Sequence, residues 1–334
     1  MNVLRKILVN KDVSCKSVWF MRQAGRYLPE FREIRSKNKD FIKLCLNSEL
    51  STDITLQPIK RFNLDAAIIF SDILLVPYML GQNVDFKKEG GPKLSNFRFE
   101  NLKNNNSEGF LNKMKPVYDA IKNTREKLDT SKSLIGFVGA PWTLLIYMLN
   151  LPKDKSSYTE SLLNSKTMDD ILSILHEYLC LHIKNQINAG VEIVQIFDSW
   201  AGLLSESDLV KFCYRPNLKL VEYCKKMKTP VICFPKGIKE KYSDFNKFVK
   251  PDALNLDYDL DPHWCKDNLK NVVLQGGLNP KTLLKTEDEM FATATKYIEI
   301  FKDIPYIFNL GHGLLPETDP DRLSKLIKFY RNHP

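Results

Sequence analysis

The sequence predicts an α/β fold of the (β/α)8 TIM-barrel class. Eight short apolar runs have strand character, and stretches of helical period separate them. A strand followed by a helix, repeated along a chain, is typical of a parallel sheet. The runs do not alternate apolar with polar residues, which indicates that both faces of the sheet are buried. A closed barrel surrounded by helices satisfies these observations, and 334 residues are enough for one.

An open, doubly wound sheet is the main alternative fold. Dinucleotide-binding sheets of that kind carry Gly-x-Gly-x-x-Gly directly after the first strand. This sequence has no such motif after its first apolar run. We therefore expect the closed barrel, with strands at residues 18–21, 66–70, 134–138, 191–197, 231–234, 253–256, 272–275 and 306–310.

Several helix starts are marked by a Ser or Thr followed three residues later by an acidic residue, which is the spacing of a capping box. The pattern occurs at Thr167 with Asp170, Ser205 with Asp208, and Thr286 with Glu289. Gly190 is a suitable stop for the helix expected after Thr167, because glycine readily adopts the left-handed conformation found beyond helix ends.

Residues 87–133 are expected to form an elaborated connection after the second strand, because they combine Gly-Gly-Pro, three consecutive asparagines and a helical run. No internal repeat, low-complexity tract or Pro/Ser-rich linker marks a domain boundary. The sequence thus predicts a single barrel domain over residues 1–334.

The composition is that of a globular protein, with 43% hydrophobic and 27% charged residues. The net charge of +9 would suit nucleic acid, a membrane surface or an acidic small molecule. Nucleic acid is not expected, because the lysines are dispersed among acidic neighbours and no basic face carries interleaved aromatics. No apolar run approaches the roughly 18 residues of a membrane span, and the N-terminus lacks a signal-peptide core, so we expect a cytoplasmic protein without membrane association.

The seven cysteines include no Cys-x-x-Cys pair and mostly lie within apolar runs. Free cysteine behaves as a small buried hydrophobe in such surroundings. We expect reduced core thiols and no disulfides.

Arginine is concentrated in one segment. The chain has 11 arginines among 49 basic residues, and four of them, Arg22, Arg26, Arg32 and Arg35, lie within residues 21–35. A guanidinium group stays charged at any working pH and binds carboxylates or phosphates through two parallel hydrogen bonds. The segment is expected to form an anion-binding wall.

Polar or glycine-rich residues follow six of the eight predicted strands. They are Arg22–Arg26, Ser71–Asp72, Gly139, Asp198–Ser199, Gly276–Gly277 and Gly311–Gly313. In a barrel, the C-terminal ends of all strands meet at one rim, where the active site lies. These junctions therefore predict a pocket at that rim.

Five segments resemble the uroporphyrinogen decarboxylase family, in the order that the family has them: residues 18–31, 68–74, 136–144, 197–202 and 308–318. The resemblance extends from about residue 17 to about residue 320. It implies a (β/α)8 barrel, a homodimer, and no cofactor or metal. It further implies a carboxy-lyase of porphyrin and haem biosynthesis, which converts the four acetate side chains of uroporphyrinogen to methyl groups and yields coproporphyrinogen.

The resemblance also assigns residues. It implies catalytic roles for Asp72, Arg22 and Arg26, and substrate contacts for Arg35, Tyr147, Ser199 and His312. Three aromatic residues, Phe31, Phe137 and Phe197, are expected to form apolar sides of the cleft. The substrate carries four propionates besides its four acetates, so an arginine wall suits it.

Loss of carbon dioxide from an acetate leaves a carbanion, so the reaction needs an electron sink. A pyrrole protonated at the adjacent carbon is such a sink, and the negative charge of Asp72 would stabilise the resulting cation. The proton donor stays open at this stage. Arg22 is a poor acid because the pKa of guanidinium exceeds about 12, and His312 has the better ordinary pKa but could instead hold a side-arm carboxylate.

Simpler interpretations exist for several of these residues. Arg22 and Arg26 could bridge to Glu30 and Glu33 on the surface. Asp72 and Ser199 could merely cap helices, and Tyr147 could be a buried structural tyrosine. His312, between two glycines, could belong to a phosphate-binding loop after the last strand.

The sequence departs from the family pattern in two places. Gly277 and Asn279 stand where the family usually has Asn and Asp, and residues 150–157 replace a glycine-rich loop. Two other functions also remain open. One is a zinc-dependent corrinoid methyltransferase of the same superfamily, for which His263-Trp-Cys265 has the literal spacing of a ligand pair. The other is a non-catalytic tetrapyrrole carrier.

Overall fold

Eight parallel strands form one sheet, in the order β1-β10-β9-β8-β7-β6-β5-β2. The structure is a computed structural model that describes residues 2–86, 91–153 and 166–333. The strands are β1 Ser17–Val18, β2 Ala66–Ile68, β5 Ser133–Gly139, β6 Ile193–Asp198, β7 Val231–Pro235, β8 Ala253–Leu256, β9 Val273–Gly276 and β10 Tyr306–Phe308. All eight lie at or within a few residues of the predicted runs, and the (β/α)8 barrel is confirmed.

The barrel closes between β1 and β2 without a regular ladder. The Asp65 carboxylate accepts a hydrogen bond from the Val18 amide at 2.7 Å, and the Asp65 amide donates to the Val18 carbonyl at 3.0 Å. The Gln23 side-chain amide donates to the Ala66 carbonyl at 3.0 Å. Side chains therefore satisfy part of the backbone at this seam, which regular strand pairing would otherwise do.

Strand β1 is shorter than the predicted run over residues 18–21. The Phe20 amide donates to Gln23 Oε1 at 3.1 Å, and the Met21 amide donates to Asn309 Oδ1 at 3.2 Å. These two amides are paired with side chains, so the ladder ends at Val18. Hydrophobic patterning does not reveal such pairing.

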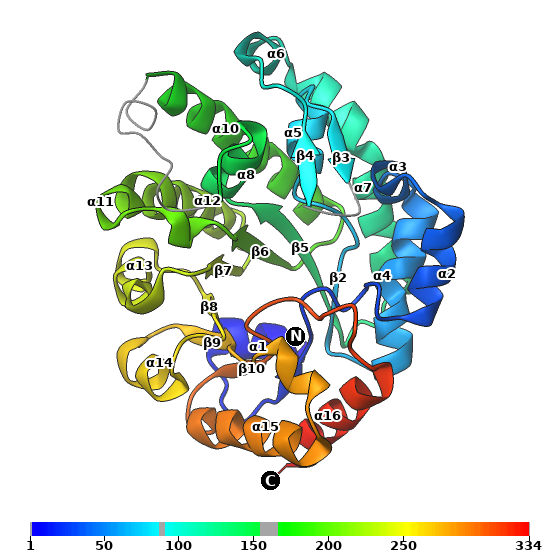
Figure 1. Ribbon diagram of the computed structural model, residues 1–334, viewed down its shortest axis with the longest axis vertical. Coiled ribbons are helices and arrows are strands. Elements are labelled where there is room, and N and C mark those ends of the chain that lie inside the picture. Colours follow the sequence, from blue (N-terminus) through cyan, green and yellow to red (C-terminus); the bar gives the residue numbers. More distant parts are fainter. Residues whose placement is uncertain (1, 87–90, 154–165, 334) are drawn as a thin grey trace.

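Helices surround the sheet on its outer side (Figure 1). The longer ones are α4 Ser48–Phe62, α7 Ser107–Lys127, α10 Lys166–Asn188, α12 Arg215–Lys226, α15 Glu287–Phe301 and α16 Pro320–Asn332. The shorter ones are α2 Pro29–Lys37, α3 Phe41–Cys45, α5 Leu75–Met79, α6 Phe99–Lys103, α8 Pro141–Met148, α11 Glu206–Asp208, α13 Tyr242–Val249 and α14 Pro262–Asn268. Among the described residues, no helix is long and apolar enough to cross a membrane.

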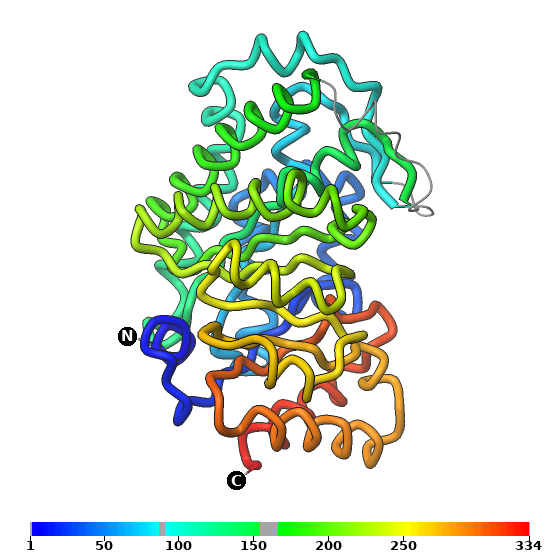
Figure 2. The backbone as a smooth tube through the Cα atoms, turned by 90° about the vertical axis from the view of Figure 1, so that its left-hand side faces the viewer, coloured from blue at the N-terminus to red at the C-terminus, as the bar shows by residue number. Residues whose placement is uncertain are grey.

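Helix α1 (Val3–Asn10) lies against one end of the barrel, where Figure 2 shows it in blue beside the N-terminus. Its buried face is Leu4, Ile7 and Leu8. These side chains belong to the cluster that fills the barrel interior, together with Trp19 and residues from the strands. A filled interior leaves the opposite end, at the C-termini of the strands, as the place for a site.

The chain between β2 and β5 contains several elements of its own. Helix α5 is followed by an antiparallel hairpin of β3 (Val84–Phe86) and β4 (Pro92–Leu94), and then by α6 and α7. The first four residues of the predicted connection, 87–90, lie outside the described residues. Figure 1 shows the hairpin and α6 above the barrel.

The predicted helix starts have mixed outcomes. Thr286 is the N-cap of α15 and forms a full capping box with Glu289, which confirms that prediction. The prediction for Thr167 was wrong, because α10 already includes Lys166 and an N-cap residue must stand outside the helix. Ser205 is the N-cap of α11, but its hydroxyl donates to Asp208 Oδ2 at 2.5 Å and caps no backbone amide. Gly190, at φ +119°, follows α10 as expected.

All seven cysteines are free, and six of them are buried. The prediction of reduced core thiols is confirmed.

Candidate active site

The barrel mouth, the end at which the strands' C-termini lie, gathers side chains from segments that are far apart in the sequence. Four of the predicted residues, Arg22, Asp72, Tyr147 and His312, follow β1, β2, β5 and β10 and influence one another electrostatically. We call these four residues the mouth cluster.

Arg22 is exposed and has a left-handed backbone, with φ +59°. Its side chain lies against Gly313 of the loop after β10, where an added Cβ would come within 2.4 Å of Arg22 Cδ. The Leu314 amide also donates to the Met21 carbonyl at 3.0 Å, which holds the two loops together. A non-glycine residue in this backbone region costs energy and is common at ligand sites.

Asp72 is half-buried, and one of its carboxylate oxygens is already used. Its Oδ1 accepts a hydrogen bond from the Leu74 amide at 2.8 Å, so the predicted capping role is partly present. No described residue bonds to Oδ2. Burial raises the pKa of Asp72 to about 6, against the lowering effects of the Leu74 amide and the Arg22 guanidinium.

His312 is half-buried beside two cations. Burial, together with the charges of Arg22 and Lys236, lowers its pKa to about 4. Its Nδ1 accepts a hydrogen bond from the Gly313 amide at 2.7 Å, which leaves the ring proton on Nε2. In the free protein at neutral pH, His312 is therefore a neutral hydrogen-bond donor and not an acid.

The arginines of residues 21–35 form no ion pairs with Glu30 and Glu33, the acidic residues of the same segment. Glu30 pairs with Arg61 at 2.8 Å, and Glu33 pairs with Lys37 at 2.8 Å. Among the described residues, the guanidinium groups of Arg22 and Arg26 have no ion pair. The interpretation of Arg22 and Arg26 as a surface bridge to these glutamates was thus wrong.

Arg32 and Arg35 are tied to nearby carbonyl groups. Arg32 donates to the carbonyls of Arg26 and Tyr27, each at 2.9 Å, and thereby braces the loop that carries Arg26. Arg35 donates to the Asn38 carbonyl and lies 5.8 Å from the centre of the Phe41 ring. The charges of Arg35 and Asp72 both act on the pKa of the buried Cys45 thiol, so both side chains lie near it.

Tyr147 and Ser199 are both half-buried. The Tyr147 ring packs edge-on against Trp200 with a centroid distance of 6.1 Å. Burial raises the pKa of Tyr147, and the Asp72 charge adds to that effect. The Ser199 hydroxyl has no hydrogen-bond partner among the described residues, and the following 3-10 turn η1 (Ala201–Leu203) has Trp200 as its N-cap. Ser199 is therefore no helix cap.

The three predicted aromatic residues differ in position. Phe137 and Phe197 are half-buried neighbours on β5 and β6, with ring centroids 5.7 Å apart. Phe31 is only 4% exposed and packs against Phe70 at 5.7 Å. Phe31 thus offers little surface to a ligand in this conformation.

Sequence reasoning missed two charged residues of the mouth. Lys236 directly follows β7, and Asp257 directly follows β8. Burial raises the pKa of Asp257, while the Lys236 charge opposes that shift. The available signal was a charged residue immediately after an apolar strand, which occurs at both positions.

Asp198, which the sequence placed among the polar strand ends without a role of its own, lies at the end of β6. It is 1% exposed and accepts hydrogen bonds from the Thr143 hydroxyl at 2.7 Å and the Asn217 amide at 3.0 Å. Burial raises its pKa to about 6 despite these bonds. Its partners lie on α8 and α12, so it fixes helices behind the mouth.

The two departures from the family pattern have structural explanations. Gly277 has φ +92°, and a Cβ there would come within 2.8 Å of the Tyr297 ring. Asn279 caps the 3-10 segment η4 (Pro280–Leu284), since its side chain accepts from the Lys281 amide at 2.9 Å. Of the replaced loop 150–157, residues 154–157 lie outside the described residues.

The possible zinc ligand pair does not converge. His263 is exposed and Cys265 is fully buried, although both lie on the short helix α14. Within the described ranges, no group of three or more His, Cys, Asp or Glu side chains could hold a metal ion.

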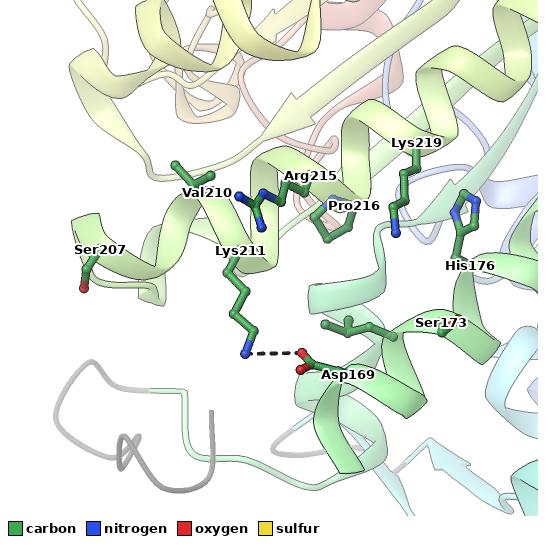
Figure 3. A pocket seen from close by; sticks show the side chains of 10 residues that line it. Asp169, Ser173, His176, Ser207, Val210, Lys211, Arg215, Pro216 and Lys219 are labelled. Carbon is green, nitrogen blue, oxygen red and sulfur yellow. Dashed lines mark ion pairs between the residues drawn. The ribbon is translucent and has the colours of Figure 1, made fainter. Parts of the chain in front are cut away.

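A separate cavity of about 530 Å³ lies on the outside of the barrel (Figure 3). Lys211, Arg215 and Lys219 project into it from the π-helical segment η2 (Leu209–Tyr214) and α12. Opposite them lie residues of α10, where Asp169 pairs with Lys211 at 3.2 Å. None of the predicted site residues is among the described residues that line it.

A parallel barrel with cationic and titratable side chains at its C-terminal mouth defines a TIM-barrel enzyme. The profile of the family described as "Uroporphyrinogen decarboxylase (URO-D)" matches residues 2–333. The chain belongs to this family.

Curated relatives and solved structures support the family and the fold, respectively. The chain is 40% identical over 324 residues to a uroporphyrinogen decarboxylase of Rickettsia felis, covering 94% of this chain and 92% of the relative. It is 39% identical over 326 residues to the one of Rickettsia bellii, covering 95% and 94%. A methyltransferase from Methanosarcina mazei has a TM-score of 0.80 at 17% identity, covering 98% of this chain and 97% of that chain, which shows the shared fold alone.

Proposed function

We propose that this protein is a carboxy-lyase that removes carbon dioxide from the four acetate side chains of uroporphyrinogen and yields coproporphyrinogen. Family membership supports the proposal. The observation that carries it is the arrangement at the mouth, where a half-buried carboxylate, Asp72, shares the site with the unpaired guanidinium of Arg22. The cation suits an acidic ligand, and the anion suits a positive charge that develops during reaction.

Arg22, Arg26 and Arg35 bind side-arm carboxylates of the substrate in this proposal. Arg22 and Arg26 have no acidic partner among the described residues, so binding would break no ion pair at these two positions. Neutral His312 donates a hydrogen bond from its Nε2–H group to a further carboxylate, and Tyr147 and Ser199 supply hydroxyl groups. Phe137 and Phe197 contact the macrocycle, whereas Phe31 packs against Phe70.

The chemical step uses the substrate ring as its electron sink. A proton adds to the pyrrole carbon next to the one that carries the acetate, which gives a ring cation. The bond to the carboxylate then breaks, its electron pair enters the ring, and carbon dioxide leaves behind an exocyclic methylene. A proton added to this methylene and the loss of the first proton restore the pyrrole, so that a proton has replaced carbon dioxide.

Asp72 stabilises the cation in this sequence and gathers the pyrrole N–H groups. Its free Oδ2 and its partial burial suit that task, because a charge in a poorly solvated site acts strongly on a neighbouring one. Arg22 and Arg26 orient the departing carboxylate, and a water molecule held by them relays the proton. His312 is not the donor in the free protein because it is uncharged at neutral pH.

Further properties belong to the proposal by family resemblance alone. We expect one domain over residues 1–334, a homodimer, a cytoplasmic location, and turnover without an added cofactor or metal. Light scattering on the purified protein would test the dimer, and turnover after dialysis against a chelator would test metal independence.

Anaerobic incubation of the purified protein with uroporphyrinogen tests the function. We expect the stepwise appearance of porphyrinogens with seven, six, five and four carboxyl groups, since one acetate is lost at each step. After oxidation to porphyrins, these species separate by chromatography. A ligand that stays bound and unchanged would overturn the proposal in favour of a tetrapyrrole carrier.

A further inference from the structure

A half-buried lysine stands across the barrel mouth from the arginines. Lys236 directly follows β7, and Arg22 lies in the loop after β1. In the eight-strand order, β7 is four strands away from β1 in either direction around the closed barrel. The two cations therefore approach the mouth from opposite sides.

The backbone on both sides of Lys236 is held in place. The Lys236 amide donates to the Asp198 carbonyl at 3.1 Å, and its carbonyl accepts from the Gly202 amide at 2.9 Å. Asp257 accepts hydrogen bonds from the Gly237 amide at 2.8 Å and the Tyr258 amide at 3.0 Å, which ties the loops after β7 and β8 together. Such bonds limit how far the Lys236 side chain can move away from the mouth.

The Lys236 ammonium group has no committed partner. Among the described residues it forms no ion pair and no side-chain hydrogen bond, although Asp257 lies near enough to feel its charge. His312, which also faces Arg22, feels the charge of Lys236 as well. A half-buried cation left without a pair is costly unless a ligand supplies the anion.

The proposed substrate has carboxylate arms on every pyrrole ring, so they point outward around the whole macrocycle. The arginines of residues 21–35 lie on the β1 side and can hold only the arms that point toward them. Arms on the opposite side need a cation there. Strand β7 lies opposite β1 in the barrel, and Lys236, which follows β7, is a half-buried cation on that side.

We propose that Lys236 binds a side-arm carboxylate of the macrocycle on the side of the mouth opposite Arg22, and that Asp257 is the positioning residue that holds the Lys236 loop. This inference rests on the proposed function for the identity of the ligand. It adds a specificity determinant, because Arg22 and Lys236 would hold carboxylates on opposite sides of the macrocycle. These two contacts would fix the orientation of the macrocycle while each acetate in turn reaches Asp72.

The test compares Lys236→Met, which keeps the length of the stem and removes the charge, with Lys236→Arg and Lys239→Met. Lys239 begins the 3-10 turn η3 (Lys239–Lys241) in the same connection after β7, is exposed, and has no ion pair among the described residues. We expect Lys236→Met to raise KM for uroporphyrinogen by about ten- to a hundredfold, as for loss of a charged hydrogen bond, and to lower kcat by less than about threefold. Porphyrinogens with seven to five carboxyl groups should accumulate.

Lys236→Arg should restore KM to within about threefold of the native value, because the charge returns. Lys239→Met should behave as the native protein. Thermal melting of each variant identifies loss of folding. A smaller folded fraction would lower the apparent kcat and leave KM unchanged, which is the opposite of the expected result. Equal KM values for Lys236→Met and Lys239→Met would overturn the inference.

A binding measurement separates failure of the inference from failure of the proposed function. Uroporphyrin, the stable oxidised macrocycle with the same eight carboxylates, is titrated into each variant and followed by fluorescence. If the native protein binds it but releases no carbon dioxide from uroporphyrinogen, the proposed reaction fails while Lys236 can still be judged. A Kd raised about tenfold or more in Lys236→Met alone supports the anchor, and equal Kd values in all variants contradict it.

Discussion

The Arg22 side chain lies over Gly313, so closely that an added Cβ at residue 313 would stand 2.4 Å from Cδ and 2.7 Å from Cγ of the arginine. The glycine thus makes room for the guanidinium stem at the mouth. The same loop contains Gly311, where an added Cβ would meet the Tyr258 backbone nitrogen at 2.3 Å. Gly313 leaves room for the Arg22 side chain, and Gly311 leaves room for the backbone at Tyr258.

Gly313→Ala is expected to displace Arg22 and to lower kcat/KM for uroporphyrinogen by about ten- to a hundredfold, the loss typical of one charged contact. The melting temperature should change little, because a side chain can move aside. Gly311→Ala is the matched control, which should lower the melting temperature because backbone cannot move aside cheaply. If Gly313→Ala melted early and kept its affinity, Arg22 would have no role that depends on this contact.

Asp72→Asn is expected to reduce kcat by about a thousandfold, in the range found when one preorganised electrostatic group is removed. The asparagine oxygen can still accept the Leu74 amide, so the local turn should persist. Binding of uroporphyrin should weaken far less, since the carboxylate serves the cation that forms only during reaction. Steady-state turnover and a fluorescence titration measure the two quantities. Equal losses in both would count against stabilisation of that cation.

The acid limb of the pH profile should report Asp72. Its pKa of about 6 means that the carboxylate is charged above that pH and protonated below it, so kcat/KM should fall as the pH drops through about 6. His312, with its pKa of about 4, is already neutral there. The His312→Gln variant should therefore show the same fall of kcat/KM near pH 6. If the fall were absent in this variant, the titrating group would be His312 and not Asp72.

Protonation of Asp72 or Asp198 is not expected to unfold the protein, so unfolding would not explain the fall of kcat/KM at acidic pH. Both have folded-state pKa values near 6, above the ordinary value of 3.8. A carboxyl group with a raised pKa contributes stability that is fully present at low pH and is lost as the pH rises through the folded value. Protonation of these two groups at pH 5 therefore favours the folded state, and melting temperatures at pH 5 and 7 provide the check.

The sequence predicted the barrel well because buried parallel strands are apolar on both faces, a pattern that needs no knowledge of distant partners. It was less informative about charges. Glu30 pairs with Arg61 of another helix. The sequence alone could not show this pairing, and so could not show that Glu30 is not a partner of Arg22 or Arg26. Lys236 does follow an apolar strand, but many lysines are scattered along this chain, so its position alone did not indicate a role until the topology placed it opposite Arg22.

The interior seam between β1 and β2 offers a test of stability. Gln23 is fully buried, accepts a hydrogen bond from the Phe20 amide at 3.1 Å and donates one to the Ala66 carbonyl at 3.0 Å. Gln23→Met keeps the approximate volume but leaves both backbone groups unpaired. Each unpaired buried group costs about 1–3 kcal/mol, so we expect a loss of about 2–6 kcal/mol in the free energy of unfolding.

Gln57→Met is the matched control for Gln23→Met. Gln57 Oε1 is buried and has no hydrogen-bond partner among the described residues, so its replacement removes a polar atom that gains nothing from folding. Denaturant unfolding should therefore show a clear loss for Gln23→Met and none, or a small gain, for Gln57→Met. Because Gln23 directly follows Arg22, the first variant should also bind uroporphyrin more weakly. Equal stability of the two variants would mean that the β1–β2 seam does not depend on the Gln23 side chain.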